Sequence, residues 1–319
     1  MPSDTTDLER RDRAGVSRRA VLRSAAAVGA LAGVTGLASA GSPDDAGRGA
    51  GRGAGHGRGG GFPPSGITEY GPAVTLGEGE ARTFTTETPA GEPKYHGVEL
   101  ERDALAGLPT ADELAGSENQ AAADKYSADG QALRVHKKWS LEFFVPFPEA
   151  AETPFTFLGL NWNPGGHPPP GVYTVPHFDV HFHMLAPATV DAITGPQPAP
   201  YDAIPAERIP EGYVRTPVPA ERYITDMGEH LIPADAPELA GGEFTNTLIQ
   251  GIVAVEGAPR LAFVEPMVTR EYLRGLAGVD RRPVPRPETY PTDERYPTSY
   301  SVRDVPSKDA IAIVMRDFE

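Results

Sequence analysis

Polar and apolar residues alternate strictly between positions 177 and 184, and this stretch constrains the fold more than any other. The odd positions all carry an imidazole or a carboxylate: His177, Asp179, His181 and His183. The even positions all carry an aromatic or aliphatic side chain: Phe178, Val180, Phe182 and Met184. Side chains two residues apart lie on the same face of a β-strand, so the pattern predicts a strand with one apolar and one polar face. A polar face made of imidazoles and a carboxylate is typical of a metal site rather than of a solvated surface.

Strand geometry restricts which of these side chains can share one ion. Residues two apart on a strand are separated by roughly 6.7 Å, and residues four apart by roughly 13 Å. A metal ion lies about 2.1 Å from each histidine nitrogen. We therefore expect His181 and His183 to form the strongest ligand pair, joined by His177 only if the strand bends. Asp179 is either a direct ligand or the acceptor that orients a neighbouring imidazole.

Further ligands have to come from other parts of the chain. His230 follows Gly228 in a loop, and Glu265 lies at the end of an apolar strand, where a surface carboxylate is less expected. His167 lies between two glycines and three prolines, which would hold it rigidly before the predicted strand. Each of the three has the alternative role of a hydrogen-bonded core residue. The candidate metal ligands are His177, Asp179, His181, His183, His230 and Glu265, with His167 as a further candidate.

A ligand set of this kind suits Zn, Fe(II) or Mn, and the sequence does not choose among them. A catalytic ion would activate water or dioxygen in hydrolytic or oxidative chemistry, with Asp179 or Glu265 as the candidate base. The alternative is a non-catalytic ligand-binding or structural envelope protein whose histidines form a buried hydrogen-bond network. The chain contains no Gly-x-Ser-x-Gly motif and no cysteine, so nucleophilic hydrolysis is not supported. The substrate or small-molecule ligand is not specified by these residues.

The N-terminal segment predicts an export signal of the twin-arginine type. Arg18 and Arg19 precede a small-residue apolar run at 25–38, and Ala38-Ser39-Ala40 offers a cleavage point. The run is shorter than the roughly 20 residues of a membrane span. We therefore expect a protein outside the cell or in its envelope, without membrane association once the signal is cleaved. A retained helical anchor is the alternative.

Composition then divides the rest of the chain. Residues 41–66 are rich in Gly and Arg and predict a flexible linker between the signal at 1–40 and one domain at 67–319. The chain has a net charge of −15 and only five lysines, a balance that resembles proteins of halophiles. Such an acidic surface excludes nucleic acid as a partner, because phosphate binding requires a basic patch.

Turn-forming residues are frequent, with 36 glycines and 34 prolines, so we expect short elements. Short β-branched and aromatic runs at 73–76, 82–86 and 310–315 predict strands, and Thr269 is the expected N-cap of a short helix at 269–276. The predicted fold is mainly β: a single antiparallel domain of the barrel or sandwich type, with a few short helices.

Several segments carry a resemblance that covers about 200 residues: Trp162-Asn163-Pro164, Gly166-His167-Pro168, Pro176-His177-Phe178-Asp179, His181-Phe182, Met227-Gly228, His230 and Glu265-Pro266-Met267-Val268-Thr269. In this order they resemble an uncharacterised family of exported bacterial and archaeal proteins, typified by a Thermus protein under extracytoplasmic sigma-factor control. The family tends to have Tyr where this chain has His183, and Trp where it has Leu231. The first departure favours a site of His177, Asp179 and His181 with His230 and Glu265. The resemblance implies a mainly β, ring-forming homo-oligomer and no established activity.

Overall fold

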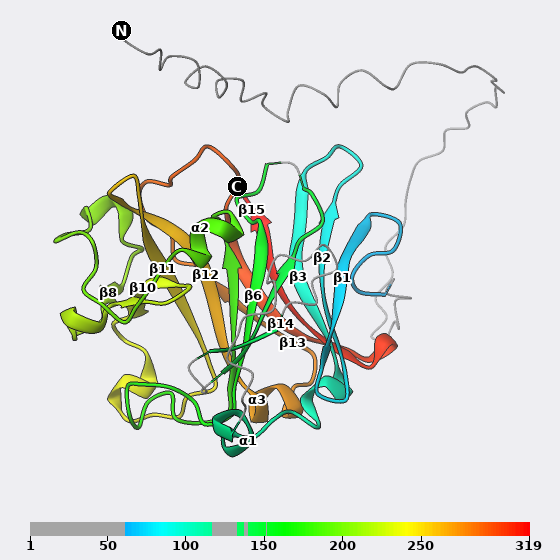
Figure 1. Cartoon of the computed structure of the whole chain (residues 1–319). Helices are drawn as coiled ribbons and strands as arrows, with labels where there is room; N and C mark the ends of the chain where they lie inside the picture. The colour runs from blue at the N-terminus through cyan, green and yellow to red at the C-terminus, as the bar shows by residue number, and fades with distance from the viewer. Residues whose placement is uncertain (1–60, 117–132, 137–139, 151) are drawn as a thin grey trace, which may run out of the picture. The chain divides into compact units, whose positions relative to one another are not determined.

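The computed structural model describes residues 61–116, 133–136, 140–150 and 152–319 (Figure 1). These residues belong to one compact unit, Gly57–Glu319. The predicted signal at 1–40 and most of the predicted linker at 41–66 lie outside the described residues, so both stay predictions.

The described strands form two antiparallel sheets (Figure 1). The first has six strands, in the order β1 (Thr68–Leu76), β2 (Gly79–Glu87), β3 (Pro93–Glu101), β15 (Ala310–Phe318), β14 (Pro297–Val305) and β13 (Val279–Pro283). The second has nine, in the order β4 (Leu133–His136), β5 (Ser140–Pro146), β6 (Phe157–Asn163), β7 (His177–His183), β12 (Ala258–Thr269), β11 (Asn246–Val255), β10 (Gly228–Pro233) and β8 (Tyr213–Arg215), with β9 (Tyr223–Ile224) paired to β10. The predicted mainly β, antiparallel fold is confirmed, and its form is a sandwich.

Helices are short throughout the described part of the chain. The α-helices are α1 (Ala111–Gly116), α2 (Pro187–Asp191) and α3 (Arg270–Gly275), and the 3-10 turns are η2 (Arg102–Leu105), η3 (Ala206–Arg208), η4 (Pro219–Glu221), η5 (Pro237–Ala240) and η6 (Pro306–Lys308). Helix α3 begins as expected, because the Thr269 hydroxyl accepts a hydrogen bond from the Tyr272 backbone N–H at 3.2 Å. A search of the described residues found no helix that is long and apolar enough to cross a membrane.

Apolar side chains from both sheets form the main core of the sandwich. Strand β7 contributes its even positions, Phe178, Val180 and Phe182, each less than 1% exposed. Strands β3 and β15 contribute Leu100 and Ile313 from the opposite sheet to the same cluster. The alternation of β7 therefore orients one face toward this core, as the sequence predicted.

The other face of the nine-stranded sheet is covered by connecting segments rather than by solvent. Tyr173, from the connection between β6 and β7, packs with Phe244 and Met267. Ile193, from the segment after β7, packs with Phe263 of β12. The odd positions of β7 are consequently as buried as the even ones. A polar strand face lies inside the protein and needs partners there.

Candidate metal centre

The candidate ligands project from neighbouring strands of the nine-stranded sheet. Strand β7 pairs with β6 on one side and β12 on the other, and its Asp179 lies opposite Met267 of β12. Glu265 is two residues before Met267 on β12, so it lies beside His181 of the neighbouring strand β7. His230 comes from β10, where it pairs with Gly251 of β11. Regular strands, rather than loops, position these three side chains, and this favours a fixed geometry.

His181, His230 and Glu265 form one group, here called the Glu265 cluster, whose ligand atoms all lie within 4.8 Å of one another. The Nε2 atom of His181 is 3.4 Å from Glu265 Oε1, and the Nε2 atom of His230 is 3.5 Å from Glu265 Oε2. A metal about 2.1 Å from each ligand places neighbouring ligand atoms about 3.0 Å apart in octahedral and about 3.4 Å apart in tetrahedral coordination. The spacing therefore fits an ion bound by two imidazoles and a carboxylate.

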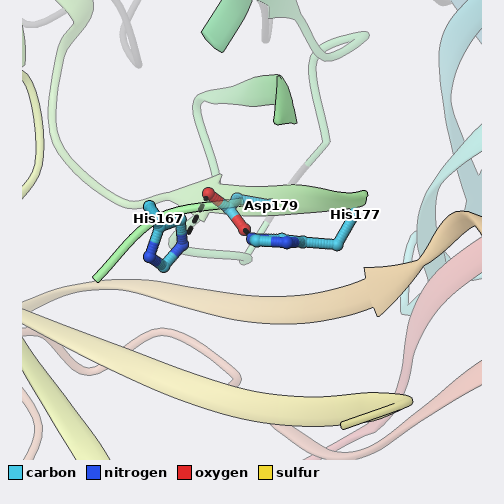
Figure 2. A group of neighbouring side chains, drawn as sticks. All are labelled: His167, His177 and Asp179. Carbon is cyan, nitrogen blue, oxygen red and sulfur yellow. Dashed lines mark ion pairs between the residues drawn. The ribbon is translucent and has the colours of Figure 1, made fainter. Parts of the chain in front are cut away.

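His167, His177 and Asp179 form a second group, the Asp179 cluster (Figure 2). The Nε2 atom of His177 is 3.0 Å from Asp179 Oδ1, and the Nε2 atom of His167 is 3.4 Å from Asp179 Oδ2. The Asn163 side-chain amide donates a hydrogen bond to the same Oδ2 at 2.8 Å and orients the carboxylate. Both histidines approach this carboxylate with Nε2, as ligands of a shared ion would.

Backbone carbonyls fix the tautomers of three of these histidines. The Nδ1 atoms of His167 and His177 lie 2.8 and 2.7 Å from the carbonyl oxygens of Pro168 and Val175. The His181 imidazole hydrogen-bonds the Gly159 carbonyl, through Nδ1 because its Nε2 has no hydrogen-bond partner among the described residues. A neutral imidazole that donates from Nδ1 directs the Nε2 lone pair at its neighbours, which is the usual arrangement of a metal-binding histidine.

Several buried atoms of the two clusters have no hydrogen-bond partner within the described part of the chain: His177 Nε2, His181 Nε2, Asp179 Oδ1 and Glu265 Oε2. Buried polar atoms without a partner are uncommon and destabilising. These four point toward one another within their clusters, and a bound cation would satisfy each of them. His230 Nδ1 is likewise without a partner among the described residues, so no neighbour fixes its tautomer.

Burial sets the protonation states of the Glu265 cluster. Burial lowers the pKa of His181 to about 4 and the pKa of His230 to about 3. Burial, and then the charge of Asp179, raise the pKa of Glu265 well above its usual value. The cluster therefore holds its proton on the carboxyl group and keeps both imidazoles neutral.

In the Asp179 cluster the pKa of the carboxyl group is lowered rather than raised. Burial alone would raise the pKa of Asp179, but its electrostatic interactions with His177 and then His167 hold it well below its usual value. Burial opposes protonation of His167, yet the Asp179 charge raises the pKa of this histidine. Asp179 is thus the ionised carboxylate of the centre.

Two glycines make room for the rings of the centre. A Cβ atom on Gly159 would lie 3.0 Å from His183 Nε2 and 3.3 Å from the Cβ atom of His181. A Cβ atom on Gly251 would lie 1.9 Å from the ring of Phe263, which contacts His181 and His230 at centroid distances of 4.9 and 5.3 Å. The sequence did not predict these packing roles, because they depend on strand register.

The structure places His183 outside both clusters. Its ring stacks on Phe157 at a centroid distance of 4.4 Å and on His181 at 5.4 Å, with interplanar angles of 12°. We expected His181 to pair with His183 around one ion. In the structure, His181 instead groups with His230 and Glu265. The physical reason is the cross-strand neighbour, since β6 places Phe157 directly opposite His183.

The remaining candidates are divided between the two clusters. His177 meets Asp179 and His167, while His230 and Glu265 meet His181. Asn163 and the buried hydroxyl of Tyr173 were not among the expected site residues. Asn163 belongs to the Trp-Asn-Pro segment of the resemblance, which was a usable signal.

No protein-family model, no curated protein and no solved structure matches this chain. The resemblance drawn from the motifs stays a prediction.

Proposed function

We propose that this is an exported protein that binds a divalent transition metal at His181, His230 and Glu265. The observation that carries the proposal is the convergence of two histidine Nε2 atoms and a carboxylate within 4.8 Å. His181 Nε2 and Glu265 Oε2 are both buried without a hydrogen-bond partner in the described chain. Two imidazoles and one carboxylate suit Zn, Fe(II) or Mn.

A catalytic role would follow from the number of protein ligands. Three ligands leave an open position on the ion, where water or dioxygen would be activated. With an ion in the Glu265 cluster alone, Glu265 is occupied as a ligand, and Asp179 is the stronger candidate for the base. It is ionised and lies two residues from His181 on the same strand face. His230 is the most exposed of the three ligands, with a side chain that is 14% exposed.

A structural role is the second candidate, and burial favours it. The side chains of His181 and Glu265 are each 1% exposed. A surface hollow lined by Arg208, Arg260 and Tyr290 shares no residue with either cluster, so it offers no substrate pocket beside the proposed ion. In this role the ion, or the hydrogen-bonded side chains alone, would join β7, β10 and β12.

Elemental analysis of the exported protein tests the proposal. We expect at least one equivalent of a transition metal in the wild type, and one equivalent fewer in a His230→Ala, Glu265→Gln double variant with an unchanged β-type circular dichroism spectrum. The structural role would be favoured if the wild type contains metal but shows no activity in a screen of substrates used by enzymes of that metal. A metal-free wild type whose thermal midpoint does not respond to added Zn2+, Fe2+ or Mn2+ would contradict metal binding altogether.

The same preparation tests the oligomeric state. The resemblance implies a homo-oligomer, and light scattering during size-exclusion chromatography measures the mass directly. A monomer of the mature chain would contradict this part of the proposal without affecting the metal site.

A further inference from the structure

We propose that the Asp179 cluster binds a second divalent transition metal ion, so that one face of the sheet carries a two-ion centre. The inference rests on the proposed function, because the first ion lies in the Glu265 cluster. It differs from that function in assigning His167, His177 and Asp179 to an ion of their own.

The buried half of this second site is already organised for a cation. His177 donates from Nδ1 to the Val175 carbonyl, so its Nε2 lone pair faces Asp179 Oδ1 at 3.0 Å. Two lone pairs at this distance repel each other unless a proton or a metal ion lies between them. Neither atom hydrogen-bonds a described residue outside this pair, so either a proton or an ion lies between them. Asn163 occupies the other carboxylate oxygen and leaves Oδ1 available to the ion.

The third ligand comes from the connection between β6 and β7. Gly166 has φ +67°, and a Cβ atom there would lie 2.1 Å from the Tyr173 carbonyl oxygen, so the chain folds back tightly at this glycine. The His167 backbone N–H donates to the same Tyr173 oxygen at 3.1 Å. This turn holds the His167 imidazole beside Asp179 (Figure 2), with Nδ1 bonded to Pro168 and Nε2 directed at the carboxylate.

The two sites are neighbours that affect each other. Asp179 and His181 are two residues apart on one strand face, a separation of roughly 6.7 Å. Two cations held by neighbouring residues of one strand face repel each other, so we expect them to bind in two steps of unequal affinity.

The second ion is the exchangeable one. The His167 side chain is 27% exposed, twice the exposure of His230, and it comes from a loop rather than from a strand. Tyr173 carries a buried hydroxyl without a hydrogen-bond partner among the described residues, and burial, followed by the charges of Glu238, Glu265 and Asp179, raises its pKa. Its ring lies 5.7 Å from the ring of His167, and its neutral O–H is a donor suited to an oxygen ligand held by an ion.

Zn2+ titration of the chelator-treated mature protein tests the two-site arrangement. We expect two equivalents bound by the wild type, one by His177→Ala and one by His230→Ala, with each variant serving as the matched control of the other. The weaker of the two wild-type steps should be the one lost in His177→Ala. One equivalent in the wild type, lost in both variants, would overturn the second site and leave the proposed function standing. No Zn2+ bound by the wild type would overturn both, and two equivalents bound by His177→Ala would overturn the second site alone.

Two further measurements protect the test against misfolded variants. His167→Ala changes a partly exposed loop residue, and we expect it to weaken the second step at least tenfold while the first is unchanged. Anomalous scattering from a Zn2+-soaked crystal of the wild type should give separate peaks beside Asp179 and Glu265. A peak beside Glu265 alone at saturating Zn2+ would overturn the second site.

Discussion

His181 Nε2 lies 3.4 Å from Glu265 Oε1, and the proton of this pair is held by the carboxyl group rather than by the imidazole. The pKa of His181 is lowered to about 4 by burial, whereas burial and then the Asp179 charge raise the pKa of Glu265. A carboxylic acid beside a neutral imidazole is a site that binds a cation only after losing its proton.

Below the raised pKa of Glu265, metal binding to this cluster should therefore release close to one proton per ion. Below the raised pKa of Glu265, the apparent affinity should increase about tenfold per pH unit, and above it the affinity should become independent of pH. Calorimetric titration with Zn2+ in two buffers of different ionisation enthalpy, repeated from acidic to neutral pH, counts the protons. A His177→Ala background isolates this cluster.

Glu265→Gln is the matched control for proton release. The amide fills the same volume but has no proton to lose in this pH range, so any remaining binding should release none. If this variant releases as many protons per ion as the protein with Glu265, the released proton comes from another group, and this would contradict the mechanism.

His183→Phe should leave the metal content unchanged. The His183 ring stacks on Phe157 and lies 5.4 Å from the ring of Phe263, so a phenyl ring meets aromatic surroundings there. The phenyl ring is larger than the imidazole, and added volume in a packed core typically lowers the free energy of unfolding by about 1–3 kcal/mol. Zn2+ titration and urea denaturation measure the two quantities. Loss of an equivalent in this variant would restore His183 as a ligand, as the sequence pattern alone suggested.

Gly251→Ala should disrupt the Glu265 cluster without touching a ligand. The added methyl group would lie 1.9 Å from the Phe263 ring, which must then move against His181 and His230. Overpacking of this kind typically lowers the free energy of unfolding by about 1–3 kcal/mol. We expect weaker Zn2+ binding as well. The double variant Gly251→Ala, Phe263→Leu should recover part of both losses, and equal damage in the single and double variants would contradict this packing role.

The sequence predicted what strand periodicity and local capping determine. The alternation of β7 identified the two faces correctly, and Thr269 was identified as the cap of α3. Glu265 was singled out because a carboxylate at the end of an apolar run is anomalous. These features depend on neighbours within a few residues, which the sequence displays directly.

The rest of the centre depends on contacts between distant segments. Nothing near His183 in the sequence shows that Phe157 lies opposite it across β6. The fold-back at Gly166 that brings His167 to Asp179 is a tertiary feature, as is the space that Gly251 leaves for Phe263. Register and loop closure are set by the whole sheet, so the sequence predicted the candidate residues but not how they group.

Export should depend on the arginine pair at positions 18 and 19. A variant with Arg18→Lys and Arg19→Lys keeps the charge but removes the paired-arginine signal, so we expect the precursor to remain inside a host that has twin-arginine export. The control is the same change at Arg10 and Arg11, a second arginine pair in the N-terminal segment. Cell fractionation with immunoblotting measures the outcome. Equal export of both variants would contradict the signal assignment.

The burial of His96 should make the free energy of unfolding depend on pH. This residue lies in β3 of the six-stranded sheet, away from the proposed metal ligands. Its side chain is fully buried, its Nε2 lies 3.0 Å from the Thr85 hydroxyl, and its ring lies 4.8 Å from that of Phe147. Burial lowers the pKa of His96 to about 3, whereas an unfolded histidine has a pKa of about 6.5. The unfolded chain therefore binds more protons than the folded chain between these values. The contribution of His96 to stability is complete above pH 6.5 and is lost as the pH falls toward 3.

The expected loss can be isolated with His96→Gln, which retains a hydrogen-bonding group for Thr85 but does not titrate. Between pH 7 and pH 5, the free energy of unfolding of the wild type should fall by about 2 kcal/mol more than that of the variant, because an unfolded histidine becomes almost fully protonated over this range. Urea denaturation in the presence of a chelator measures both proteins without a contribution from bound metal. The difference between them cancels every titration that they share, including those of Asp179 and Glu265. Parallel pH profiles would show that folded His96 accepts a proton at an ordinary pKa, and that its burial does not oppose the charge.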